Sequence, residues 1–235
     1  LGANWGFSDD RVLPTSASAR QVGDDMRSDF VVDADTDVTV VIPDASGLAP
    51  AEIERYALQL SRVADVVSVS TPGGTFQNGA SIGPPAAPTG AKDGSVFLTV
   101  RSADALFSIA SERQLDRLRA IAGPGGRDVQ LTGRAGINRD SAGAVTSRLP
   151  LVLSIIALIT FALLFVLTGS VVMPLKALVL NVLSLTAAFG ALVWIFQEGH
   201  LGALGTTANG TLMVHMPVLL FCIAFGLSMD YEVFL

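Results

Sequence analysis

The chain has 235 residues and a formal net charge of −6; half of its residues are hydrophobic and only 15% are charged. A net negative chain of this composition gives no support to a nucleic-acid partner, which needs clustered basic residues. The charges are also uneven, because residues 149–235 hold only Lys176, Glu198, Asp230 and Glu232. We therefore interpret residues 1–148 as a water-soluble domain and residues 149–235 as a membrane region.

The first predicted elements of the soluble domain are a helix and a strand. Apolar residues recur at helical spacing in "TSASARQVGDDMRSDF", behind Ser and Thr residues that can cap a helix: Ala19, Val22, Met26 and Phe30. "DVTVVIP" follows as a strand with alternate residues on one face: Val38, Val40 and Ile42.

Two further helices alternate with three further strands. Pro50 begins a helix whose buried stripe is expected at Ile53, Ala57, Leu60 and Ala64. "DVVSVS" and "SVFLTVR" are the next strands, and "VQLTG" is the last. The second helix lies in "SIASERQLDRLRAI", buried through Leu115, Leu118 and Ile121 or Ala122. The order over about 38–133 predicts an α+β class with a ferredoxin-like arrangement, two helices on a four-stranded sheet.

Residues 71–94 form a long Gly- and Pro-rich connection between the second and third strands. Its length and small residues predict a flexible loop, with a substrate lid as the alternative. "GPGGRD" after the second helix resembles a phosphate loop only superficially, because no Gly-Lys-Ser/Thr follows and the local order is helix to strand. Nucleotide hydrolysis therefore has no support.

Three stretches have the length and apolarity of membrane spans: about 149–168, 175–197 and 212–235. A polar, Ala- and Gly-rich helix from Arg134 to Arg148 is expected to run into the first span, with a kink or a new start at Pro150. The alternative, core helices of a soluble protein, would need a larger core than this chain can build. Basic residues flanking the spans balance, so charge leaves the sidedness open.

The sequence contains no pattern typical of a metal or cofactor site. Cys222 is the single cysteine, and neither His200 nor His215 has Cys, His or carboxylate neighbours at metal-ligand spacing. We expect no metal, no cofactor and no enzyme activity. The chain begins with Leu1 rather than Met, so we expect it to be a piece of a longer protein.

The last stretch, "FGLSMDYEVFL", places carboxylates directly after an apolar run. A charged side chain at the bilayer centre costs about 2.5–3.5 kcal/mol on insertion scales, so an intramembrane Asp is expected to be functional. Tyr231 carries a hydroxyl donor beside Asp230. Asp230 and Glu232 point about 200° apart on a helix and cannot share a proton as a pair. The alternative is that these residues end the span and contact interfacial water.

Several motifs resemble the MmpL family of actinobacterial membrane exporters, in the resistance-nodulation-division superfamily. They are "WGFSDDRVLP", "SRLP", "GSVVMPLKALVLNVLSLTAAFGALVWIFQEGHL" and "LLFCIAFGLSMDYEVFL". The resemblance covers nearly the whole chain and is loosest between Thr71 and Gly126. It implies a piece of the second half of such a protein, from just after transmembrane helix 7 into helix 10.

The resemblance implies a function as well as an architecture. Residues 1–148 would be an extracytoplasmic porter-like domain on a multi-pass protein of the inner (plasma) membrane. Asp230 and Tyr231 would form a proton relay facing a second Asp-Tyr pair in the missing N-terminal half, with Glu232, Ser228 and Asn181 as possible supporting residues. The implied activity is export of lipids or amphipathic molecules, driven by the proton motive force.

Two other functions compete with this interpretation. An intramembrane aspartyl protease needs two Asp residues on facing helices, commonly with a Gly-x-Gly-Asp context that "GLSMD" does not supply. A membrane module of the same architecture could instead bind a lipid or a partner protein without proton-coupled transport. A second Asp-Tyr motif in the adjoining sequence would separate these alternatives.

Overall fold

The computed structural model describes the backbone of residues 2–7, 9–29 and 34–234, and the side chains of residues 2–7, 9–29 and 35–228. These residues form two compact units, described separately below. Asp24–Arg139 is the sheet unit; Leu1–Gly23 and Asp140–Leu235 together are the helical unit. The predicted division at 148–149 concerns where the chain enters the membrane, and it stays a prediction.

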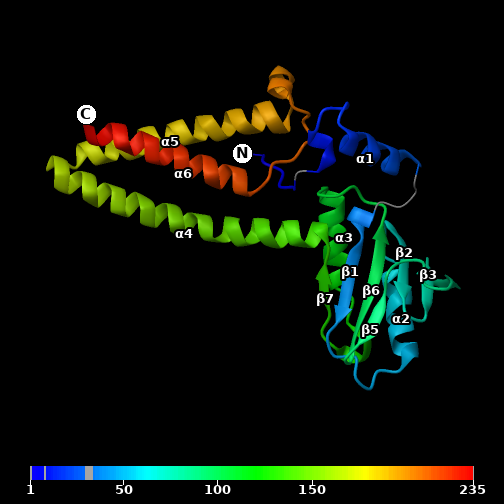
Figure 1. Cartoon of the computed structure of the whole chain (residues 1–235). Helices are drawn as coiled ribbons and strands as arrows, with labels where there is room; N and C mark the ends of the chain where they lie inside the picture. Colours follow the sequence, from blue (N-terminus) through cyan, green and yellow to red (C-terminus); the bar gives the residue numbers. More distant parts are fainter. Residues whose placement is uncertain (1, 8, 30–33, 235) are drawn as a thin grey trace. The chain divides into compact units, whose positions relative to one another are not determined.

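The sheet unit contains an antiparallel sheet whose described strands lie in the order β4-β3-β2-β6-β1-β7, with β5 also paired to β6 (Figure 1). The strands are β1 (Val38–Ile42), β2 (Val66–Thr71), β3 (Gly74–Gln77), β4 (Ala80–Gly83), β5 (Gly90–Lys92), β6 (Ser95–Ser102) and β7 (Gln130–Thr132). In the register, Val40 of the interior strand β1 pairs with Leu98 of β6 on one side and Leu131 of β7 on the other. The predicted α+β class is confirmed.

Helices α2 (Pro50–Leu60) and α3 (Ile109–Arg119) share one hydrophobic core with the sheet. Val38, Val40 and Ile42 are at most 2% exposed, which confirms that alternate residues of β1 are buried. The predicted stripe of α2 is right at Ala57 and Leu60, but α2 ends at Leu60, so Ala64 lies beyond the helix and is exposed.

Side chains cap the first turns of α2 and α3 in the sheet unit. The Ser108 side chain accepts a hydrogen bond from Ser111 N over 3.1 Å at the start of α3, and Glu52 closes the first turn of α2 by accepting from Ala49 N over 3.0 Å. On α3, Leu115 and Leu118 are buried, and Ile121 rather than Ala122 packs against the core.

The expectation of a loop without regular structure over residues 71–94 is corrected by strands β3, β4 and β5. Asn78-Gly79 joins β3 to β4, and Asp93-Gly94 joins β5 to β6. All four turn residues have positive φ, from 50° to 78°, as two-residue hairpin turns require. Short Asn-Gly and Asp-Gly turns therefore convert this small-residue segment into hairpins.

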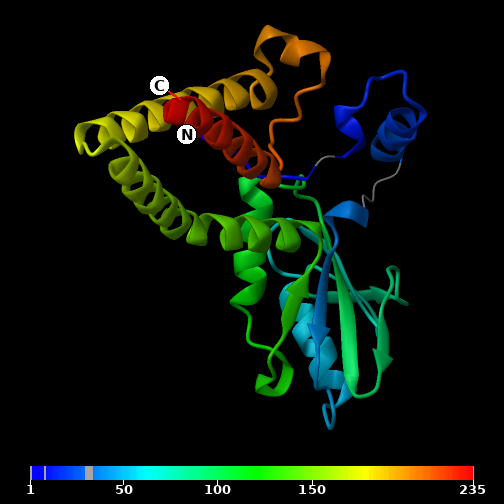
Figure 2. The same cartoon turned by 60° about the vertical axis from the view of Figure 1, so that its left-hand side comes forward.

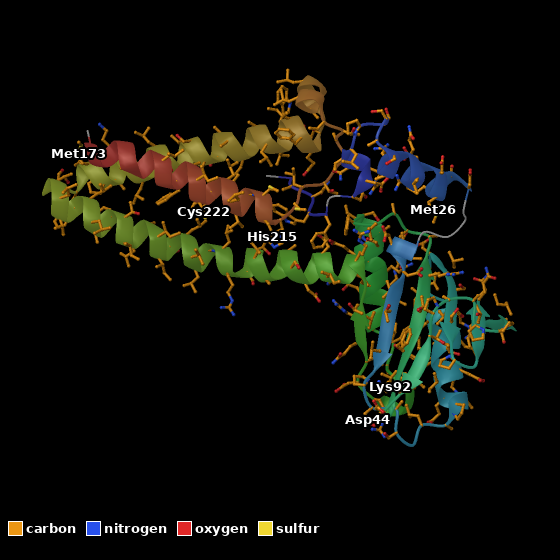
Figure 3. All side chains as sticks on the ribbon, in the orientation of Figure 1. Met26, Asp44, Lys92, Met173, His215 and Cys222 are labelled. Atoms are coloured by element: carbon orange, nitrogen blue, oxygen red, sulfur yellow. The ribbon has the colours of Figure 1, made fainter. Side chains whose placement is uncertain are left out.

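Helix α1 (Ser18–Asp29) is present as predicted, but none of its described residues is buried. Val22 is 61% exposed and Met26, labelled in Figure 3, is 50% exposed. Phe30, the last residue of the predicted stripe, lies outside the described residues. The periodicity of this segment thus predicted the helix correctly, although its described apolar residues are not buried in this chain.

The helical unit is built on α4 (Arg134–Thr168), α5 (Val172–Leu192) and α6 (His215–Phe234). The helix α5 continues as a π-helical turn, Val193–Gln197. Helices α5 and α6 run antiparallel, as both views show (Figures 1 and 2). Short 3-10 helices occupy Asp10–Val12, Ala34–Thr36, Pro124–Gly126 and His200–Gly205 of the chain.

Two described helices are long and apolar enough to cross a membrane, Arg134–Thr168 and Val172–Gln197. Only 11% and 6% of their apolar windows are buried, which argues against core helices of a soluble protein. Pro150 lies inside the continuous helix α4 rather than at a new start. The span predicted from residue 212 begins as helix at His215, because Leu212 is engaged in a backbone bridge with Trp5. A third span stays a prediction.

Candidate functional site

The predicted proton-relay residues Asp230 and Tyr231, with Glu232, fall within helix α6. Their side chains lie outside the described residues. The described part of α6 has two sides. Pro217, Phe221 and Ser228 are half-buried, whereas Ile223 and Leu227 are 53% and 56% exposed. The possible supporting residue Ser228 therefore lies on the packed side of α6.

The supporting residue Asn181 is a buried side chain of α5, at 2% exposed. Its position continues a packed stripe at helical spacing from Pro174 to Val193, which are also buried. Neither Nδ2 nor Oδ1 of Asn181 has a hydrogen-bond partner among the described residues. A buried amide without partners costs about 1–3 kcal/mol, so this side chain is an exception within an apolar stripe.

A second buried polar side chain of the helical unit lies at a depth similar to that of Asn181. Asn181 is nine residues, or about 13.5 Å, from the start of α5 at Val172. Thr160 of α4, 5% exposed, lies about 12 Å from the α4–α5 turn, close to the depth of Asn181.

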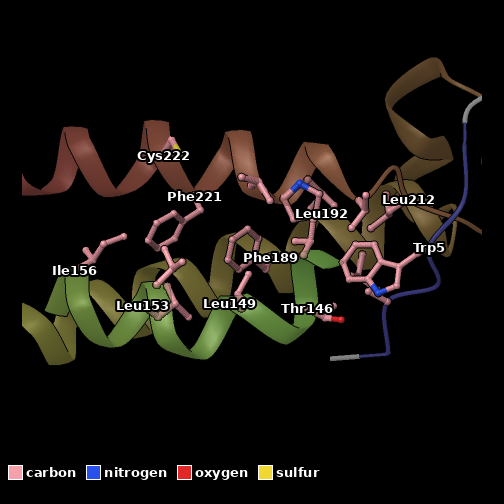
Figure 4. A pocket seen from close by; sticks show the side chains of 17 residues that line it. Trp5, Thr146, Leu149, Leu153, Ile156, Phe189, Leu192, Leu212, Phe221 and Cys222 are labelled. Carbon is pink, nitrogen blue, oxygen red and sulfur yellow. The ribbon is translucent and has the colours of Figure 1, made fainter. Parts of the chain in front are cut away.

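An apolar cavity of about 350 Å³ lies between α4, α5 and α6 in the helical unit (Figure 4). Its volume falls within the range of about 300–1,000 Å³ typical of ligand sites. It is lined by 17 residues, of which Thr146, Trp5 and Cys222 are the ones with polar side-chain atoms. Leu149 and Leu153 of α4 face Phe189 and Phe221 across it (Figure 4). This arrangement can hold a hydrocarbon chain.

Sequence reasoning missed this cavity. Its walls come from four parts of the chain that are far apart in sequence, including the N-terminal residues Ala3 and Trp5. The spans were predicted, but how their faces pack against one another was not. The motif that contains Trp5 was noted only as part of the family resemblance, and no apolar pattern in it indicated a cavity wall.

No group of three His, Cys, Asp or Glu side chains suited to a metal ion occurs among the residues whose placement is described. His200 stacks on Trp194 with ring centroids 4.5 Å apart, and its Nδ1 lies 2.9 Å from Trp194 O. Cys222 lines the cavity on α6 (Figures 3 and 4). The histidine thus has a local packing role at the end of α5.

Shifted pKa values outside the membrane-spanning segments occur at Tyr56 and Asp104 of the sheet unit and at Asp9 near the N-terminus. Burial raises the pKa of Tyr56 to about 12, and its hydroxyl has no described hydrogen-bond partner. Burial, with the nearby Asp65, raises the pKa of Asp104. Burial opposes ionisation of Asp9, but hydrogen bonds and charge from Arg11 outweigh it and lower the pKa of Asp9. None of these groups joins a cluster with catalytic geometry.

The comparison with known proteins places these helices and the sheet in one family. The model of the MMPL family matches residues 11–235, almost the whole chain. The chain belongs to the MMPL family. The chain is similar to SCO6666 of Streptomyces coelicolor, named as a membrane protein, which is 32% identical over the whole of this chain and 30% of its own length.

Two mycobacterial relatives of this MMPL chain are named as lipid exporters. The trehalose monomycolate exporter MmpL3 of Mycolicibacterium smegmatis is 36% identical over 64% of this chain and 15% of its own length. The mycolic acid-containing lipids exporter MmpL11 of the same species is 33% identical over 81% of this chain and 19% of its own length. The chain therefore spans less than a third of the length of these relatives.

Proposed function

We propose that this MMPL chain is part of a membrane exporter of lipids or amphipathic molecules, and that its cavity holds an acyl chain. The cavity carries the proposal, because an apolar space between membrane helices suits a hydrocarbon chain. The relatives MmpL3 and MmpL11, which are named as lipid exporters, suggest the substrate class. No step of this function requires an enzyme activity.

The proposed topology follows from the family. Residues 1–148 would be extracytoplasmic, and α4, α5 and α6 would cross the inner membrane. The cavity lies toward the start of α4 and α6 and the end of α5, so it would open in the outer half of the bilayer. The βαββαβ order around β2-β6-β1-β7 supports, in addition, a ferredoxin-like, porter-type assignment for the domain.

We further propose that export is driven by protons passing through Asp230 and Tyr231. A proton moving inward releases about 2.3 kcal/mol per 100 mV of membrane potential. Helical periodicity groups position 230 with positions 223 and 227, and both of those described residues are exposed in this chain. A partner Asp-Tyr pair in the missing half would approach that exposed side. The chain supplies only half of the proposed relay.

The acyl-chain assignment is testable with two matched substitutions on α4 of the full-length protein. Leu153→Trp fills the cavity, whereas Leu158→Trp adds the same bulk at a position that is 69% exposed. We expect Leu153→Trp to reduce both the lipid that co-purifies with the protein and its export in cells. Leu158→Trp should change neither. Undiminished lipid and export in Leu153→Trp would contradict the proposal.

The same experiment separates transport from binding alone. A membrane module that binds lipid without transporting it would also lose co-purified lipid in Leu153→Trp. Cells that lack such a module would still export the lipid at the normal level. The amount of co-purified lipid is measured by mass spectrometry of the purified protein. Export is measured as the amount of lipid recovered in the outer envelope.

A further inference from the structure

A short extended segment, Gly2–Gly6, lies along the acyl-chain cavity in the helical unit. Leu212 N donates to Asn4 O over 2.8 Å, and the segment's last amide donates to Leu212 O over 3.0 Å. The two stretches thereby form a short parallel bridge. Side chains of an extended segment alternate between two faces. Ala3 and Trp5 share the face that lines the cavity, whereas Asn4 is exposed.

Gln197 fixes this segment with both ends of its amide. Its Oε1 accepts from Asn4 N over 2.8 Å, and its Nε2 donates to Gly2 O, also over 2.8 Å. Gln197 is 8% exposed and is the last residue of the π-helical turn that begins at Val193, another cavity residue. Turns of π-helix are rare and concentrate at functional sites. One turn therefore lines the cavity and also holds the segment.

Trp5 lies at one end of the cavity, next to Leu212 and Thr146, with Ile156 at the other end (Figure 4). The cavity follows α4 from Val145 to Ile156, eleven residues or about 16 Å. A fully extended polypeptide advances about 3.6 Å per residue over three backbone bonds. An extended hydrocarbon chain therefore advances about 1.2 Å per bond. The space between the two ends therefore matches an acyl segment of about 13 carbons.

We infer that Trp5 determines the acyl-chain length that the cavity accepts, and that Gln197 is a positioning residue that holds Trp5 in place. The inference rests on the proposed function, since it needs an acyl chain in the cavity. The indole closes the end of the cavity farthest from Ile156. Without the indole, this end of the cavity would be open where Asn4 is exposed, and longer acyl chains would fit along the same helices.

The test uses the purified full-length protein and two fatty acids that carry a terminal diazirine, one of about 12 carbons and one of about 20. Photolabelled peptides from α4, α5 and α6 are quantified by mass spectrometry. We expect the wild type to favour the shorter probe. Trp5→Ala should raise the ratio of long-probe to short-probe labelling by on the order of tenfold. An apolar pocket discriminates by about this factor between ligands that differ by a methylene or two.

Gln197→Leu should raise the ratio in the same direction without touching the indole, an effect that mere loss of stability would not produce. Trp5→Phe should restore most of the wild-type preference. Trp194→Ala is the matched control, because Trp194 belongs to the same π-helical turn but stacks on His200 instead of lining the cavity.

The two levels of the proposal fail in different ways. No labelling of the cavity peptides in the wild type would overturn the acyl-chain assignment, and the inference with it. Wild-type labelling with an unchanged length preference in Trp5→Ala would overturn the inference alone. A changed preference in Trp5→Ala but not in Gln197→Leu would overturn the positioning role of Gln197.

Discussion

Replacing Asn181 by Leu should make the full-length protein more stable and less active. Asn181 is 2% exposed, and neither polar atom of its amide has a partner among the described residues. An unsatisfied buried polar group costs about 1–3 kcal/mol, and Leu has a similar volume without that penalty. We therefore expect Asn181→Leu to raise the free energy of unfolding by about 1–3 kcal/mol.

The functional half of this prediction follows from the proposed role of Asn181. A polar group inside an apolar span is expected to be functional, and we propose that this buried amide supports the relay from the packed side of the helices during proton transfer. Export by Asn181→Leu should then fall by roughly tenfold or more, equivalent to about 1.4 kcal/mol. The free energy of unfolding is measured on purified protein in detergent, and export is measured in cells.

The control is Thr186→Leu, which makes the same kind of polar-to-apolar change on the exposed side of α5. Its hydroxyl donates within the helix to Val182 O over 2.7 Å, so its loss should alter stability little. Lower stability in Asn181→Leu would mean that the amide is hydrogen-bonded in the full-length protein. Unchanged export would remove Asn181 from the supporting residues.

Three further predictions concern the second carboxylate and the sheet unit. Glu232→Gln should reduce export less than loss of Asp230, because the two positions are about 200° apart on α6; an equally complete loss in the same export assay would reverse their ranking. Leu118→Ala should lower the free energy of unfolding by about 2–5 kcal/mol, since Leu118 is 0% exposed in the core; chemical denaturation monitored in the sheet unit would show it. The raised pKa of Tyr56 contributes stability that is fully present below pH 10 and is lost as the pH rises through about 12, so denaturation midpoints should fall over that range in the wild type and less in Tyr56→Phe.

The sequence predicted those parts of the fold in which periodicity and burial coincide. Alternation in "DVTVVI" located the interior strand β1, and helical spacing located Leu115 and Leu118, because each pattern reflects one face packed on a core. The hairpins within residues 71–94 were missed although Asn78-Gly79 is a strong turn signal. The strands that it joins, β3 and β4, are four residues each, too short to show alternation against a background of Gly and Pro.

The candidate site was predictable only in part. Asn181 was selected as a polar group inside an apolar span, and Ser228 as a small residue that lets helices approach closely; their supporting role stays a proposal. The cavity could not, because Trp5 reaches it through backbone pairing with Leu212, more than two hundred residues away in sequence. Packing between distant segments produces no periodic pattern in the sequence of any one segment. The proposed role of Gln197 could not be predicted either, because it rests on two hydrogen bonds to residues that are far away in sequence, Gly2 and Asn4.

The central claim, proton-coupled lipid export through Asp230, is tested most directly by Asp230→Asn in the full-length protein. The substitution keeps the size and hydrogen-bonding capacity of the side chain but removes its ability to carry a proton. Export should be abolished while expression, membrane insertion and lipid co-purification remain at wild-type levels. Export at the wild-type rate by Asp230→Asn would contradict the account.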